Sequence, residues 1–160
     1  MMSEPPFDKE QANRWFAVQL NNRAWDLLEA AQRTDAECDE LVHVAHASVY
    51  HWLRAGNAVN QARAMCLLGN AYSALERGPE ALRYAGQCVE LTEKHAADVA
   101  DWDFAFAYDC QARANAAAGN RPEAESLKSK AAEYGQRIAD ADDQKFFDQW
   151  FASGNWHGID

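Results

Sequence analysis

The sequence has few of the residues that build β-sheets. Only seven Val, two Ile and two Thr occur among its 160 residues, and β-branched side chains are the ones enriched in strands. Alanine, the best helix former, makes up about one residue in five. The composition therefore predicts an all-α chain. Since 48% of the residues are hydrophobic, the chain can form one domain with its own core.

Basic residues are also scarce. Fifteen Lys and Arg stand against 25 Asp and Glu, which gives a formal net charge of −10. Nucleic acids and anionic membrane surfaces are bound by basic patches, so neither is expected as a partner. The excess of acid favours solubility and a basic protein partner.

Long apolar runs are absent. No segment approaches the roughly 18 apolar residues of a membrane-spanning helix. The first ten residues, MMSEPPFDKE, lack the basic and then apolar layout of a secretory leader. We therefore expect a cytoplasmic protein.

The four cysteines are far apart, and no CxxC motif occurs. Each falls in a different one of four successive expected helices. Without a leader, buried reduced thiols are the favoured interpretation; an even number of cysteines leaves disulfides as the alternative for a secreted chain. The residues are Cys38, Cys66, Cys88 and Cys110.

Proline, glycine and helix-capping residues divide the chain into seven expected helices. Asp8 with Gln11, and Thr34 with Glu37, have the spacing of capping boxes. Residues 102–108 alternate like a strand, but no second strand is available to pair with them. Short loops predict antiparallel neighbours. The expected helices span about 8–33, 34–55, 58–76, 79–97, 101–119, 122–139 and 142–152, with Gly78 ending the third.

One segment carries the pattern of a known helical repeat. It reads Met65-x2-Leu68-Gly69-x2-Tyr72, followed by Gly78-Pro79 and Ala81. This stretch resembles a tetratricopeptide repeat. Met65 replaces the usual Trp, Ala85 replaces the usual Phe, and the closing Pro is absent. The resemblance explains the mid-helix glycine, which costs about 1 kcal/mol relative to Ala: small residues at Gly69 and Ala81 let paired helices approach closely.

A second and weaker copy follows. Its Ala124 corresponds to Ala81, so the repeat length is 43 residues rather than the usual 34. Helices one and two would form a third, degenerate pair. The resemblance implies a single domain, residues 1–160, folded as a right-handed superhelix of about three antiparallel helix pairs. The matching positions of the second copy are Tyr108, Gln111, Ala112, Asn115 and Gly119.

The C-terminal region is expected to cap this array. The seventh helix clusters its aromatic residues, Phe146, Phe147, Trp150 and Phe151, and would cover the last apolar face. Residues 153–160 form a tail. Five of the six tryptophans are expected in the core. Trp156, in the tail, either folds back onto the helices, docks on another subunit, or belongs to a flexible end.

The resemblance implies a non-catalytic protein-interaction module, because such arrays bind a protein or peptide on a concave face. The chain is also similar to uncharacterised bacterial proteins of this kind. Asn70 falls where many family members bind a peptide backbone or carboxylate, although Cys66 stands where their clamp has Lys. The residues expected on the concave face are Arg63, Asn70, Ser73, Phe106, Asp109 and Arg113.

Two other functions remain as alternatives. Glu40, His43 and His46 follow one another at three-residue spacing on one helix, which could contribute to a metal or small-molecule site, or to the active site of an enzyme. One helix supplies too few ligands for a metal, and no second Glu-x-x-His occurs. No phosphate loop, nucleophile motif or HExxH is present, so no enzyme, cofactor or metal is expected. The second alternative is a homo-oligomer joined through the aromatic C-terminus.

Overall fold

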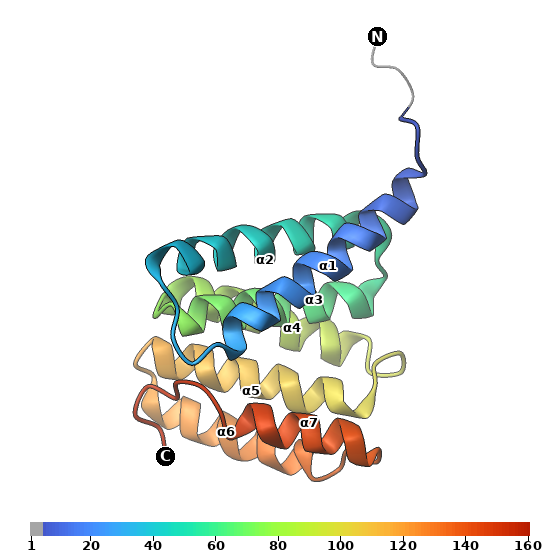
Figure 1. Cartoon of the computed structure of the whole chain (residues 1–160). Helices are drawn as coiled ribbons and strands as arrows, with labels where there is room; N and C mark the ends of the chain where they lie inside the picture. Colours follow the sequence, from blue (N-terminus) through green and yellow to red (C-terminus); the bar gives the residue numbers. More distant parts are fainter. Residues whose placement is uncertain (1–4) are drawn as a thin grey trace.

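A computed structural model describes residues 5–160 of the chain (Figure 1). This part of the chain is all-α, as predicted, and contains no strand. Residues 1–4, which belong to the segment examined for a leader, lie outside the described residues. The helices are α1 (Lys9–Glu29), α2 (Asp35–Ala55), α3 (Ala58–Ala74), α4 (Gly78–Lys94), α5 (Asp101–Ala117), α6 (Arg121–Gly135) and α7 (Ala141–Phe151).

The helices begin where the sequence signals place them. Asp8 caps α1 by accepting a hydrogen bond from the backbone N–H of Gln11 at 2.7 Å. Thr34 and Glu37 form a reciprocal capping box at the start of α2. These side chains satisfy N–H groups that a helix start leaves without internal partners. Residues 102–108, the candidate strand, lie within α5.

The helix ends differ from the expected ones. Helix α1 ends at Glu29, four residues early, because Ala30 adopts an extended conformation. Helix α3 ends at Ala74, and the left-handed residue beyond it is Glu76, with φ of 59°. Gly78 therefore does not end α3; it begins α4. A Cβ at Gly78 would lie 2.7 Å from the Cα of Ala118, so this glycine permits close packing against the end of α5.

The helices stack in order along the chain (Figure 1). Each helix packs against the next one, and α3 also contacts both α1 and α5. Helix α7 packs against α5 as well as α6. As Figure 1 shows, α1 and α7 lie on the same side of α3 and α5. We call this side of α3 and α5 the inner face.

Close helix contact at Gly69 follows the sequence prediction. A Cβ on Gly69 would lie 2.5 Å from the sulfur of Cys110 and 3.2 Å from the backbone nitrogen of Ala85. Ala81 is fully buried. Because any larger side chain at residue 69 would overlap α4 and α5, the glycine fixes the spacing of three helices.

The first turns of α1 project beyond the rest of the stack (Figure 1). Trp15 lies there with 58% of its surface exposed, so its expected place in the core is wrong. The Trp15 ring meets that of Phe16, whose ring centre is 5.0 Å away. Within residues 5–160, no helix combines the length and apolar character needed to cross a membrane.

Candidate functional site

The six residues expected on the concave face lie on α3 and α5. All except Arg63 are buried, so five of them do not present an open surface. Helix α1 packs over α3, and α7 with the C-terminal segment packs over α5. Arg63 keeps 40% of its side chain exposed and forms a bidentate ion pair with Asp103, with both N–O distances at 2.8 Å.

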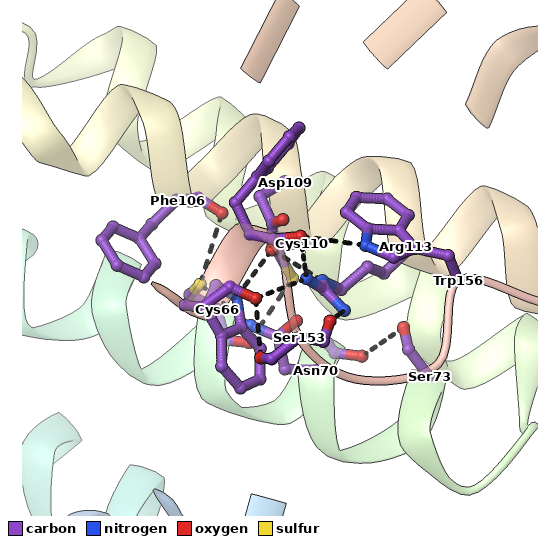
Figure 2. Close-up of polar contacts among 12 residues, drawn as sticks. Cys66, Asn70, Ser73, Phe106, Asp109, Cys110, Arg113, Ser153 and Trp156 are labelled. Atoms are coloured by element: carbon purple, nitrogen blue, oxygen red, sulfur yellow. Dashed lines mark hydrogen bonds and ion pairs between the residues drawn. The ribbon is translucent and has the colours of Figure 1, made fainter. Parts of the chain in front are cut away.

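A buried ion pair fastens the C-terminal segment to α5 (Figure 2). The Nε of Arg113 lies 2.9 Å from Oδ2 of Asp109, which is completely buried. The same guanidinium donates hydrogen bonds to the carbonyl oxygens of Trp150 and Ser153, each at 3.0 Å. The Trp150 indole N–H donates to Asp109 at 2.8 Å. These contacts provide partners for Arg113 and for Oδ2 of Asp109, as buried charges need, while Oδ1 of Asp109 has no hydrogen-bond partner among residues 5–160.

The tail folds back onto the helices of its own chain, which is the first of the three possibilities considered for Trp156. The Trp156 indole N–H donates to the carbonyl oxygen of Phe151 at 3.0 Å. The guanidinium of Arg113 lies 4.1 Å from the Trp156 ring centre, and the ammonium of Lys128 lies 4.3 Å from it. Ile159 is buried beside Trp156. The aromatic residues considered for subunit contacts thus pack largely within the chain.

Two cavities remain on the inner face, on either side of a contact between α1 and α7. The contact joins Trp25 and Trp150, whose rings meet edge to face at a centroid distance of 4.9 Å. Trp25 lines one cavity and Trp150 lines the other. Helices α3 and α5 contribute to both. The candidate site is therefore a divided space rather than one continuous groove.

The first, which we call the aromatic cavity, has a volume of about 430 Å³. Its buried carboxylate has partners: Asp103 binds Arg63 and also accepts from the backbone N–H of Ala100 at 2.8 Å. The Arg63 guanidinium stacks on Trp102, 4.2 Å from the ring centre. Its lining residues are Asn21, Asn22, Trp25, Ala62, Arg63, Cys66, Cys88, Thr92, Trp102, Asp103, Phe106, Ala107, Asp143 and Phe146.

The second, the polar cavity, has a volume of about 420 Å³. Two buried atoms of its lining, Oδ1 of Asn70 and Nε of Arg33, have no hydrogen-bond partner among residues 5–160. Buried polar atoms are usually paired. Its lining residues are Leu28, Glu29, Ala30, Ala31, Arg33, Asn70, Ser73, Ala74, Arg113, Trp150, Ser153, Gly154 and Asn155.

The histidine stripe on α2 does not assemble into a ligand set. Arg23 binds Glu40 at 2.7 and 2.8 Å, and this hydrogen bonding lowers the pKa of Glu40. His46 is hydrogen-bonded to the hydroxyl of Tyr72 at 2.7 Å, while His43 is exposed. Burial lowers the pKa of His46. Within residues 5–160, no three His, Cys, Asp or Glu side chains are placed to hold a metal.

The four cysteines are free thiols, as expected. Cys66, Cys88 and Cys110 are buried, whereas Cys38 is half-buried. A hydrogen bond to Cys110 and burial raise the pKa of Cys66, and a hydrogen bond to Cys66 with burial does the same for Cys88. Because the thiolate is the reactive form, these side chains serve as small apolar residues in the wall of the aromatic cavity.

Sequence reasoning placed the site on α3 and α5 and missed the residues that close it. Trp25 comes from α1, Arg33 from the α1–α2 loop, and Phe146 from α7. One signal existed, since the clustered aromatic side chains of residues 142–152 predicted that this segment covers an apolar face. Comparisons of the chain with family models, curated proteins and solved structures return no match.

Proposed function

We propose that the chain is a tetratricopeptide-like superhelix of three helix pairs, α1–α2, α3–α4 and α5–α6, closed by α7. The order of contacts supports this arrangement: the pairs pack in sequence, and their first helices, α1, α3 and α5, also contact one another in turn. The close approach at Gly69, described above, occurs where the repeat pattern requires a small residue.

On this fold we propose a non-catalytic function, the binding of a segment of another protein on the inner face. The observation that carries the proposal is the aromatic cavity. Its walls include the rings of Trp25, Trp102 and Phe106, and Phe146 at its edge is 52% exposed. A pocket with apolar walls that reaches the surface is typical of sites that take one large anchor side chain.

The chemistry of the cavity defines the partner segment. Since Arg63 and Asp103 already satisfy each other, the interior favours an apolar anchor, either aliphatic or aromatic. Asp142 and Asp143 in the first turn of α7 place negative charge beside the opening, in a chain that is acidic overall. We therefore propose a segment in which the apolar anchor is flanked by Lys or Arg, because opposite charges promote association.

Blocking the cavity tests this function. Asn22 is exposed at the edge of the aromatic cavity, so Asn22→Trp should fill its opening without disturbing the core. Asp26→Trp is the matched control, because Asp26 is exposed on α1 but does not line the cavity. Proteins captured at native abundance would be identified with the wild-type chain, and the binding of the captured segment would then be measured by calorimetry.

We expect Asn22→Trp to weaken that binding at least about tenfold and Asp26→Trp to leave it nearly unchanged. Equal binding by both variants would place the partner elsewhere and reject the aromatic cavity as its site. Failure of the wild-type chain to retain any partner at native abundance would count against the interaction function itself.

A further inference from the structure

The polar cavity contains two buried polar groups that the protein itself leaves unused. Asn70 is 2% exposed, and its Oδ1 lacks a hydrogen-bond donor among residues 5–160. The Nε of Arg33, in the same described part of the chain, lacks an acceptor. Both residues line the polar cavity. An unpaired buried polar atom is costly, so this cavity is prepared for a ligand with a complementary donor and acceptor.

The protein holds both groups in place. The Nη1 of Arg33 donates to the carbonyl oxygen of Leu27 at 2.9 Å, which fixes the guanidinium at the end of α1. Asn70 sits on α3, where it is almost fully buried and its Nδ2 donates a long hydrogen bond of 3.5 Å to the sulfur of Cys66. Figure 2 shows Asn70 and Ser73 on α3, with Ser153 of the C-terminal segment nearby. A ligand would therefore meet oriented polar groups.

The charges around the cavity select a ligand with no net charge. Two cations, Arg33 and Arg113, line it. Glu29 lines it as well, and Asp109 neutralises Arg113 from α5. Positive and negative charges thus balance at this cavity, where Glu29 is exposed, and a ligand that carries both signs can meet charges of both signs.

From these observations we propose that the polar cavity binds a free α-amino acid in its zwitterionic form. The Nε–H of Arg33 donates to the ligand carboxylate, and Oδ1 of Asn70 accepts from the ligand ammonium group. The apolar part of the lining, which includes Leu28, Ala74 and Trp150, contacts the ligand side chain. The volume of about 420 Å³ is large enough for an amino acid. This site is separate from the aromatic cavity and does not depend on the function proposed there.

Calorimetry on the full chain tests the proposal. Each of the common amino acids would be titrated in turn, and every one that binds would be compared with its N-acetyl form, which lacks the ammonium, and with its amide, which lacks the carboxylate. We expect at least one free amino acid to bind and both altered forms to bind at least about tenfold more weakly. No binding up to about 10 mM, or equal binding of the N-acetyl form, would overturn the proposal.

Two kinds of variant locate the site. Ala31 is exposed and lines the polar cavity, whereas its exposed neighbour Gln32 does not, so Ala31→Trp should abolish binding and Gln32→Trp should preserve it. Asn70→Ala should lose at least about tenfold in affinity with little change in the thermal melt, because the one side-chain hydrogen bond that Asn70 makes within residues 5–160 is a long one, 3.5 Å, to the sulfur of Cys66. Unchanged amino-acid affinity in Ala31→Trp would overturn the assignment even if Asn70→Ala failed to fold. Asn22→Trp should not affect this binding, which separates the two sites.

Discussion

The two cavities have the same supporting helices but opposite chemistry. On α3, Cys66 faces the aromatic cavity and Ser73 faces the polar one; on α5, the corresponding residues are Phe106 and Arg113. Each pair is seven residues apart, which is about two helical turns, so both members lie on the same face of their helix. Two turns along the same inner face therefore suffice to change an apolar pocket into a polar one.

The difference also lies in how polar groups are satisfied. In the aromatic cavity, Asp103 has partners on both carboxylate oxygens. In the polar cavity, Asn70 and Arg33 each keep an unpaired atom. A buried group that is already paired contributes to stability, whereas an unpaired one is available to a ligand. The first cavity is thus suited to shape recognition and the second to hydrogen-bond recognition.

The largest expected effect comes from the ion pair beside the polar cavity. Arg113→Ala leaves Asp109 buried without its cation, and breaking a buried pair typically costs about 3–5 kcal/mol. For a chain of this size we expect the melting temperature to fall by about 10 °C. Arg63→Ala is the comparison at the aromatic cavity, where the arginine is 40% exposed. Its effect on the melt should be clearly smaller, and equal losses would contradict the distinction drawn here.

The second largest effect on stability is expected at Gly69, where α3 packs against α4 and α5 behind both cavities. A Cβ on Gly69 would overlap Cys110 of α5, whereas a Cβ on Gly86 of α4 would meet no atom within 4 Å. Gly69→Ala should therefore destabilise the fold by about 1–3 kcal/mol, and Gly86→Ala should stabilise it by about 0.5–1 kcal/mol through helix propensity. Chemical denaturation of both variants measures whether each substitution lowers or raises the free energy of unfolding. A stable Gly69→Ala would show that α3, α4 and α5 can separate without loss.

The contact that separates the cavities is expected to have a smaller effect. Trp25 is half-buried against Trp150, and an aromatic pair contributes about 0.5–1.5 kcal/mol beyond its area. We expect Trp25→Ala to cost about 2 kcal/mol, and Trp15→Ala, at the exposed start of α1, to change stability by less than about 0.5 kcal/mol. Thermal melts of the two variants measure this difference. A larger fall in melting temperature for Trp15→Ala than for Trp25→Ala would refute the ranking.

The secondary structure was readable from the sequence because its signals are local. The Asp8 and Thr34 caps and the low β-branched content fix the helices within a few residues. The close contact at Gly69 was also predictable, since the repeat pattern around Gly69 calls for a small residue where paired helices meet. The left-handed Glu76 was not, because glycine at residue 78 offered the more usual way to end α3.

The candidate site was only partly predictable because it depends on distant segments meeting. The resemblance to a helical repeat predicted that Asn70 and Arg113 lie on the inner side of their helices. It could not reveal that Trp150 and Ser153, some forty residues after Arg113 in the sequence, would cover them. Burial of Arg113 is a tertiary property, and an arginine in a helical pattern is ordinarily assigned to the surface.

The smallest expected effect lies on the outer side of α3, away from both cavities, where His46 meets Tyr72. Burial lowers the pKa of His46 in the folded state, so the unfolded chain takes up a proton first as the pH falls below about 6.5. The contribution of neutral His46 to the free energy of unfolding is fully present above about pH 6.5. It decreases below that pH and is lost as the pH falls through the pKa of His46 in the folded state. His46→Gln should reduce this loss, measured by denaturation between pH 7.5 and 5, while His43→Gln, at an exposed position on the same helix, should retain it. If the pH dependence of stability disappeared in His43→Gln but persisted in His46→Gln, it would come from His43, and the role given to the burial of His46 would be contradicted.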